Sequence, residues 1–318
     1  AAMAADPLVS IITPAYNAER FLPATIRSVR AQSLADWEWI IADDGSTDGT
    51  LALLRAAARE DPRIRIIEGE HAGRPAVGRN RALAQARGQW IAWQDADDLW
   101  ARGHLSTMTA ALLRAGKRWG FANVRTFGDG GVLAAGYCFA RGWRPPAPIF
   151  RQLLSVEGIP IVTTIVRRDL LAEVSPGGDP SRAVDEGELV EDLDLCLRLS
   201  LVEEPLYVPR VLGAYRLHAG GISKSGDREL RRQLAVVEKW RGLGAPERLC
   251  RNAELLHRSK YAVALLFGGR PGWRAGLAAA ARRMPPTARD LYFAAMSLLP
   301  APLARRAYLL GLGRLRRG

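Results

Sequence analysis

Four apolar runs rich in Ile, Val and Trp alternate with amphipathic helical patterns through about the first hundred residues, and this alternation constrains the fold most strongly. The apolar runs span residues 8–16, 37–44, 63–69 and 89–98. Between them, apolar side chains recur at helical spacing over residues 20–33, 48–60 and 76–88. Strands that alternate with helices in this way predict an α/β fold with a mostly parallel central sheet flanked by helices.

Polar clusters follow three of these four predicted strands. The first strand ends at TPAYN, the second at ADDGSTDGT and the fourth at DADD. Open α/β sheets bind ligands beyond the carboxyl ends of their strands. One edge of the sheet is therefore expected to collect Thr13, Tyr16, Asp43, Asp44, Asp95, Asp97 and Asp98. The carboxylates of Asp95, Asp97 and Asp98 are so close together in sequence that they repel one another unless a cation, or a ligand that brings one, lies among them.

Two nucleotide-binding patterns are absent from the sequence. No G-x-G-x-x-G follows the first strand, which excludes a dinucleotide-binding domain for hydride transfer. No G-x-x-x-x-G-K-[ST] occurs either, which excludes a P-loop.

Five segments in order along the chain resemble the family 2 inverting glycosyltransferases with a GT-A fold, of the non-processive bacterial type. They are VSIITPAYN, IIADDGSTDGT, GRNRALAQARGQWIAWQDADD, VEDLDLCLRL and YRLHAGGIS. The resemblance implies a nucleotide-sugar donor, usually a UDP-sugar, and direct displacement at the anomeric carbon by a hydroxyl of a glycan or lipid-linked acceptor. It also implies a divalent metal, Mn²⁺ or Mg²⁺, held by a DxD-type motif. The QxxRW motif of the processive synthases is missing.

The resemblance divides the chain into two regions. Residues 7–225 form the glycosyltransferase domain, with a nucleotide-binding half at 7–100 and an acceptor half at 101–225. Residues 226–318 form a helical C-terminal extension.

The donor nucleotide is assigned to the first half by resemblance. Tyr16 would lie along the base, Asp44 would accept a hydrogen bond from the imide N–H of the base, and Thr13 and Ala15 would offer backbone contacts. The alternative for the Asp44 segment is an ordinary loop that caps the next helix through Asp48.

Basic and acidic residues near the nucleotide are assigned in the same way. Arg79, with Arg74 as a second candidate, resembles the basic residue of the family beside the nucleotide, although arginines are common on surfaces. Asp95 would lie nearer the ribose.

The metal is assigned to Asp97, with Asp98 and His218 as further ligands. Hard divalent cations take oxygen ligands and can bridge a diphosphate to a carboxylate. The alternatives are a solvated acidic turn for the carboxylates and a purely structural histidine.

The acid pair Glu191–Asp192 is the catalytic assignment. The leucines that follow it alternate, which would permit a strand, whereas the resemblance implies a helix. The resemblance makes Asp192 the base that takes the proton from the acceptor hydroxyl. Asp194 would point elsewhere on a helix, and Arg198 could pair with an acid one turn or more back. The alternative is a charged first turn favoured by the helix dipole.

The net charge of +12 is distributed unevenly. Residues 1–226 hold 26 Lys and Arg against 27 Asp and Glu, whereas residues 227–318 hold 19 against 6. The C-terminal stretch interleaves Arg with Leu, Tyr and Phe, which favours an anionic membrane surface over nucleic acid as its partner. A plain helical subdomain with a solvated basic face is the alternative.

The cellular location is inferred from three absences. The three cysteines are odd in number and widely spaced, the first residues lack a secretory signal, and no apolar run reaches the roughly 18 residues that span a bilayer. We therefore expect a cytoplasmic protein, and the basic C-terminal stretch favours a peripheral position on the inner face of the cell membrane.

Two other functional classes fit parts of the pattern. A nucleotidyltransferase acting on sugar phosphates shares a similar sheet and metal site, but its usual Gly-rich, Arg-bearing loop after the first strand is missing. A catalytically inactive sugar-nucleotide-binding protein would have no need for Asp192.

Overall fold

The computed structural model describes residues 6–128, 142–155, 158–187, 190–218, 227–267, 269–279, 282, 293 and 295–306. The strands are β1 (Val9–Ala15), β2 (Trp37–Asp43), β3 (Ile64–Glu68), β4 (Trp90–Trp93), β5 (Leu99–Trp100), β6 (Trp119–Gly128), β7 (Ile165–Arg167) and β8 (Leu206–Leu217). The α-helices are α1 (Leu22–Arg30), α2 (Thr50–Glu60), α3 (Pro75–Leu83), α4 (His104–Ala115), α5 (Ile149–Ser155), α6 (Arg168–Glu173), α7 (Glu191–Val202), α8 (Asp227–Gly242), α9 (Glu247–Phe267) and α10 (Trp273–Ala279). Short 3-10 helices are η1 (Ile161–Thr163), η2 (Pro176–Gly178) and η3 (Pro180–Arg182).

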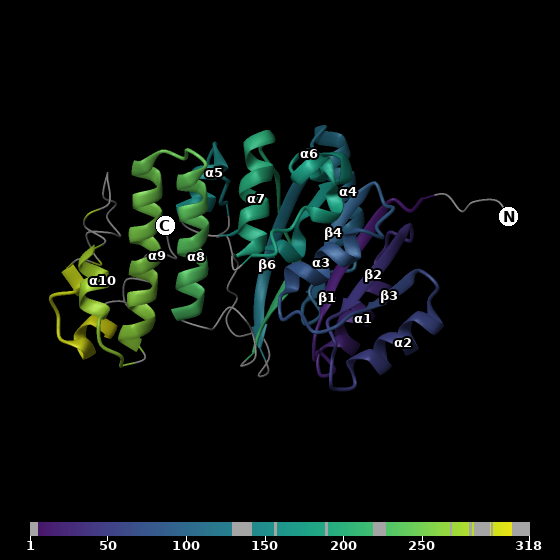
Figure 1. Ribbon diagram of the computed structural model, residues 1–318, viewed down its shortest axis with the longest axis horizontal. Helices are drawn as coiled ribbons and strands as arrows, with labels where there is room; N and C mark the ends of the chain where they lie inside the picture. Colours follow the sequence, from purple (N-terminus) through teal and green to yellow (C-terminus); the bar gives the residue numbers. More distant parts are fainter. Residues whose placement is uncertain are drawn as a thin grey trace. The chain divides into compact units, whose positions relative to one another are not determined.

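The strands form one sheet in the order β3-β2-β1-β4-β7-β6-β8-β5. Figure 1 labels β1 to β4 and β6 of this sheet. The first four strands run parallel, as the alternation of strands and helices predicts. β2 is buried at every position, because parallel strands are covered on both faces. This explains why the strand appears in the sequence as a continuous apolar run.

Helix α3 packs on β1 and β2. It was predicted to continue to Gly88 but ends at Leu83. The chain has to turn there because Gly88 lies against β1, where its N–H donates to the hydroxyl of Ser10 at 2.8 Å. A Cβ atom at position 88 would lie 2.4 Å from the backbone nitrogen of Ser10, so only glycine fits without a shift of the backbone.

The second half of the sheet is mixed, because β7 and β5 run opposite to the other strands. β7 pairs antiparallel with both β4 and β6, and β6 pairs parallel with β8. The two-residue strand β5 pairs antiparallel with β8, with Leu99 opposite Ala214. This pairing brings the residues before β5 beside the end of β8.

The segment after Glu191 is the helix α7, as the resemblance implies. Its leucines alternate because the helix is buried around most of its circumference. Leu193, Leu195, Leu197 and Leu199 are all buried. A helix of this kind has no polar stripe that would reveal its period.

The described chain divides into two compact units. The first contains residues 1–149, 159–187 and 194–218, and the second contains residues 150–158, 188–193 and 219–318. In the second unit, α8 and α9 lie side by side (Figure 1), and a separate apolar core forms around Leu266, Trp273 and Leu277. The helices expected in the C-terminal extension are present, while its predicted boundary at residue 226 stays a prediction. In the described ranges, every helix is too short or too polar to cross a bilayer.

Candidate active site

The predicted polar clusters lie at the carboxyl ends of β1, β2 and β4, which are neighbours in the sheet. β1 has β2 on one side and β4 on the other, so the connections leave it in opposite directions. In open α/β sheets, ligands bind at such a switch point.

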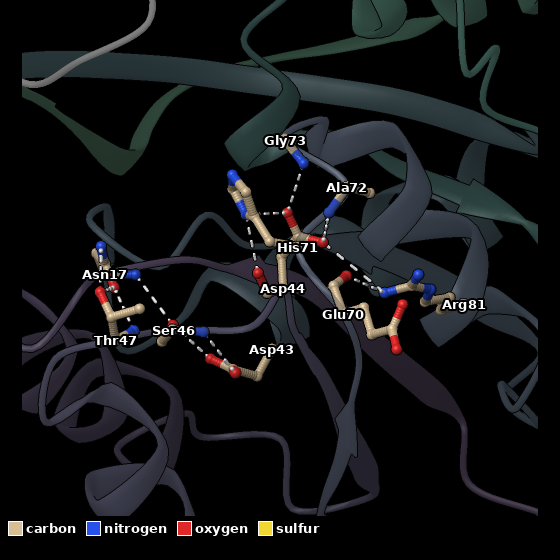
Figure 2. A network of polar contacts seen from close by, with 10 residues as sticks. All are labelled: Asn17, Asp43, Asp44, Ser46, Thr47, Glu70, His71, Ala72, Gly73 and Arg81. Carbon is tan, nitrogen blue, oxygen red and sulfur yellow. Dashed lines mark hydrogen bonds and ion pairs between the residues drawn. The ribbon is translucent and has the colours of Figure 1, made fainter.

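Asp43 ends β2 and organises the turn that follows it. Its Oδ2 accepts a hydrogen bond from the N–H of Ser46 at 3.0 Å, and its Oδ1 accepts one from the Ser46 hydroxyl at 2.6 Å. The Ser46 oxygen accepts from the N–H of Asn17 at 3.0 Å, and Asn17 Oδ1 accepts from the N–H of Thr47 at 2.8 Å. These contacts join the loop after β1 to the loop after β2 (Figure 2).

Asp44 is buried, and its carboxylate is held by the loop that follows β3. Its Oδ1 accepts from the N–H of Ala72 and its Oδ2 from the N–H of Gly73, both at 2.9 Å. Arg81 of α3 lies 3.7 Å from Oδ1 (Figure 2). The carboxylate proposed to bind a base is therefore positioned by residues from the adjacent loop.

His71 contributes a ring to the same site. It stacks on Tyr16, with ring centroids 4.1 Å apart and planes 25° apart. Its Nδ1 lies 3.0 Å from the backbone oxygen of Asp44 and 3.1 Å from Oδ2. Nothing in the sequence singles out His71 beyond its place after the third strand, at the same edge of the sheet.

Thr13 and Ala15 lie in β1 with buried side chains. The Thr13 hydroxyl accepts from the indole N–H of Trp39 at 2.8 Å, and the Ala15 carbonyl accepts from the N–H of Asp44 at 2.8 Å. These contacts fix β1 against β2. The backbone contacts of Thr13 and Ala15 with a ligand stay a prediction.

Arg79 is buried in α3 and pairs with Asp95, with Nη2 2.7 Å from Oδ1. The pair connects α3 to the turn after β4. Arg74, the second candidate, donates to the backbone oxygen of Glu186 at 2.6 Å. Asn80 of the same helix holds this segment as well, since its Nδ2 donates to Val184 O at 2.7 Å.

The acidic turn after β4 is fixed by two buried polar side chains. Gln94 Nε2 donates to the carbonyl oxygens of Asp95 and Asp98. The hydroxyl of Thr25 in α1 lies 2.9 Å from Ala96 O and 3.0 Å from Asp98 O. The turn is therefore built to hold its carboxylates in place.

Asp97 pairs with His218, with 2.8 Å between Oδ2 and Nε2. Burial and the neighbouring charge of Asp95 raise the pKa of Asp97 above its ordinary value, and the hydrogen bond with His218 opposes this shift. The His218 ring also packs against Phe21, with centroids 4.4 Å apart. The two residues are 121 positions apart in sequence and meet because β5 pairs with β8.

Asp98 is buried and faces the backbone of β8. Its Oδ1 accepts from the N–H of Arg216 at 2.7 Å, whereas Oδ2 has no hydrogen-bond partner in the described part of the chain. Burial, followed by the charges of Asp97 and Asp95, raises the pKa of Asp98 well above its ordinary value. Arg216, which the sequence did not single out, also donates to Asp97 O at 2.7 Å.

The residues fit a divalent cation that shares its coordination with a ligand. No group of three His, Cys, Asp or Glu side chains in the described ranges is arranged to hold a metal alone. However, Mg²⁺ sites commonly use one or two protein carboxylates together with substrate phosphates. Asp97 and His218 supply two adjacent donor groups, and Asp98 leaves one buried carboxylate oxygen unsatisfied.

Glu191 and Asp192 lie in the first turn of α7. Glu191 forms an ion pair with Arg232 of α8 at 2.9 Å, and Asp192 Oδ1 accepts from the N–H of Leu193 at 2.8 Å. Asp194 differs from both because it is fully buried and pairs with Arg198 at 3.0 Å, one turn along the helix. The predicted pairing of Arg198 with an acid one turn back is confirmed.

Known proteins share both the sequence and the fold. Residues 10–155 match the family described as Glycosyl transferase family 2. The Escherichia coli UDP-Glc:alpha-D-GlcNAc-diphosphoundecaprenol beta-1,3-glucosyltransferase WfgD is 30% identical over 236 residues, which cover 73% of this chain and 86% of that protein. The enzyme of the same description named WfaP, also from Escherichia coli, is 28% identical over 237 residues with the same coverage of both chains.

Solved structures share the fold at low sequence identity, among them one from Staphylococcus aureus and one from Pyrobaculum calidifontis. Staphylococcus aureus TarS 1–349 in complex with UDP-GlcNAc matches with a TM-score of 0.60 at 16% identity, over 95% of this chain and 92% of that one. The mannosyltransferase PcManGT from Pyrobaculum calidifontis, in complex with GDP-Man and Mn²⁺, matches with a TM-score of 0.60 at 19% identity, over 98% and 87%. The chain therefore belongs to glycosyltransferase family 2 and is a glycosyltransferase with the GT-A fold.

Proposed function

We propose that this enzyme transfers a sugar from a UDP-sugar to a hydroxyl of a lipid-linked glycan acceptor, with inversion at the anomeric carbon. The observation that carries the proposal is the meeting of two groups at one sheet edge: Tyr16 and Asp44 from β1 and β2, and Asp97 and His218 after β4 and β8. The names of WfgD and WfaP, which state a UDP-glucose donor and a GlcNAc-diphosphoundecaprenol acceptor, support both substrate classes.

The donor nucleotide would lie across the ends of β1 and β2. Asp44 accepts a hydrogen bond from the base, and Tyr16 offers its half-exposed ring for stacking. Arg79 and Asp95 hold each other at the boundary between the nucleotide and the acidic turn. Asp95 in turn faces the ribose.

A divalent cation, Mn²⁺ or Mg²⁺, would be held by Asp97 and His218, with Asp98 as a further carboxylate. When bound, such a cation supplies positive charge beside the diphosphate that leaves. The raised pKa values of Asp97 and Asp98 support this assignment, because a cation would relieve the repulsion among the carboxylates.

Asp192 acts as the general base in this proposal. It takes the proton from the acceptor hydroxyl as the oxygen forms its bond to the anomeric carbon. The bond between that carbon and the diphosphate breaks, and UDP leaves from the opposite face. Glu191, which is held by Arg232, fixes the start of α7 beside it.

Association with a membrane surface is the last element of the proposal. Residues 227–318 combine a strong excess of positive charge with exposed apolar side chains, among them Phe267, Leu298 and Leu303. Basic residues with exposed apolar side chains favour the interface of an anionic bilayer, where a lipid-linked acceptor resides.

The test is transfer from a panel of UDP- and GDP-sugars, with Mn²⁺, to a GlcNAc-diphospholipid acceptor. We expect release of UDP that depends on the acceptor, and a product of inverted configuration at the anomeric carbon. A second assay supplies UTP and sugar 1-phosphates, and release of pyrophosphate in that assay would instead identify a nucleotidyltransferase. Tight donor binding with neither transfer nor hydrolysis would identify an inactive binding protein.

A further inference from the structure

We propose that the imidazole of His71 occupies the nucleobase subsite in the free enzyme and that the donor has to displace it. The inference rests on the proposed function, because it takes Tyr16 and Asp44 as the residues that meet the base. His71 would then be a built-in competitor that sets the affinity for the donor.

The first observation is the stack between His71 and Tyr16. The ring centroids are 4.1 Å apart and the planes are within 25° of parallel. This is the separation and orientation of two stacked aromatic rings, so no base fits between them. One face of the Tyr16 ring is therefore already covered by an aromatic nitrogen heterocycle, the imidazole of His71.

The second observation is the contact between His71 and Asp44. Nδ1 of His71 lies 3.0 Å from the backbone oxygen of Asp44 and 3.1 Å from its Oδ2 (Figure 2). Both oxygens are acceptors, so Nδ1 has to carry the proton and donate it. The imidazole thus presents a ring N–H to Asp44, as the imide N–H of a base would.

The third observation is that the His71 ring can move away while the loop after β3 keeps its backbone hydrogen bonds to Asp44. The N–H groups of Ala72 and Gly73 bind the Asp44 carboxylate independently of the imidazole. The side chain of His71 is 48% exposed, so it can rotate toward solvent without opening a buried core. His71 would lose only its stack on Tyr16 and its Nδ1 contact with Asp44, and the base would make the same two contacts in its place.

Gly45 explains how His71 comes so close. Its φ of +71° is a left-handed conformation, and a Cβ atom there would lie 2.9 Å from the backbone nitrogen of His71. The glycine lets the loop after β3 lie directly on the turn after β2. The backbone of His71 therefore lies close enough to this turn for its ring to reach Asp44.

The energetic consequence is a reduction in apparent affinity. A ligand whose site is open in only a fraction of molecules binds more weakly by that fraction. The competing interactions are one aromatic stack and one hydrogen bond, each of modest strength. Their removal should tighten binding about tenfold, which corresponds to about 1.4 kcal/mol.

The experiment compares the wild type with His71→Ala by calorimetric titration in the presence of Mn²⁺, using UDP and inorganic pyrophosphate as ligands. We expect UDP to bind about tenfold more tightly to His71→Ala and pyrophosphate, which has no base, to bind both proteins equally. His71→Gln, which keeps a donor for Asp44 but has no ring, should fall between the two. In the wild type, UDP should move the His71 ring resonances away from their positions in the stack with Tyr16.

Two results would overturn the inference. UDP binding that is unchanged or weaker in His71→Ala, with pyrophosphate unaffected, would mean that the imidazole supports the base instead of competing with it. Unmoved His71 resonances at saturating UDP would mean that the base lies elsewhere. If neither protein bound UDP at all, the proposed function itself would fail, and this inference with it.

Discussion

Asp192 is the residue at which chemistry and binding can be separated. Its carboxylate lies in the first turn of α7, so its loss should affect the proton transfer and leave the donor site intact. We predict that Asp192→Asn lowers the transfer rate by roughly 10²–10⁴, as expected for loss of a general base, with UDP affinity nearly unchanged. Single-turnover kinetics and UDP titration measure the two effects.

The control for this substitution has to be chosen from the structure. Asp194 is two residues away but is a poor match, because it is buried in an ion pair with Arg198. Asp179→Asn is better, since the side chain of Asp179 caps the short turn η3 through Ser181 and asparagine can accept the same bonds. A large loss of UDP affinity in Asp192→Asn would mean that Asp192 organises the donor.

Substitution of Asp97 tests whether a divalent cation takes part in transfer. We predict that EDTA abolishes transfer and that Asp97→Asn both slows transfer and weakens UDP binding, because the bridge between carboxylate and diphosphate is lost. The measurement is UDP titration with and without Mn²⁺ in both proteins. Full transfer activity in EDTA would remove the metal from the proposal.

His104 gives the fold a dependence on pH. It begins α4 fully buried against Trp100, and neither ring nitrogen has a hydrogen-bond partner in the described chain. Burial lowers its pKa to about 3. Since the unfolded imidazole binds a proton below about pH 6.5, the unfolded state binds more protons than the fold between these values, and stability falls as the pH falls.

We predict that His104→Leu removes this contribution. Between pH 7.5 and pH 5, urea unfolding should show a loss of stability that is smaller than in the wild type by about 2 kcal/mol. Carboxylates titrate in both proteins and cancel in the comparison. Parallel losses would contradict the burial of a neutral imidazole.

At the scale of elements, α7 depends on the Asp194–Arg198 pair. Arg198 also donates to the carbonyl oxygens of Val174 and Ala183, so the pair connects the helix to the residues that directly follow α6 and η3. Removal of one partner leaves the other charge buried and uncompensated. We predict that Asp194→Asn lowers the free energy of unfolding by about 3 kcal/mol, measured by urea denaturation.

The surface pair Arg167–Asp169 is the matched control. Its side chains are 38% and 53% exposed, so Asp169→Asn should cost at most about 1 kcal/mol. Equal costs for the two substitutions would show that the α7 pair is not structural.

The helices and strands could be predicted from the sequence more fully than the side-chain contacts between distant segments. The period of apolar residues identified β1 to β4 and the helices between them, and the strand ends located the polar edge. The pattern could not distinguish α7 from a strand, because that helix is buried on most sides. It also could not find His71 or Arg216, whose roles arise from contacts between distant segments that no local period records.

At the scale of the whole molecule, the positive charge is concentrated beyond residue 226. We predict that deletion of the residues from Thr287 onward weakens binding to anionic liposomes at moderate salt, because both charge and exposed apolar side chains are lost. Co-sedimentation with anionic and neutral vesicles measures this. Equal binding by the full and truncated chains would indicate a packing role for these residues.

The pairing of β5 with β8 has a consequence for biosynthesis. Asp97 is made early, whereas its partner His218 follows the last strand of the sheet. A nascent chain that has emerged only as far as η3 already contains every residue of the Tyr16–Asp44–His71 cluster but has nothing to pair with Asp97. The nucleotide side of the site can therefore assemble during translation, and the cation side is completed only after the chain has emerged as far as His218, 36 residues beyond the end of η3.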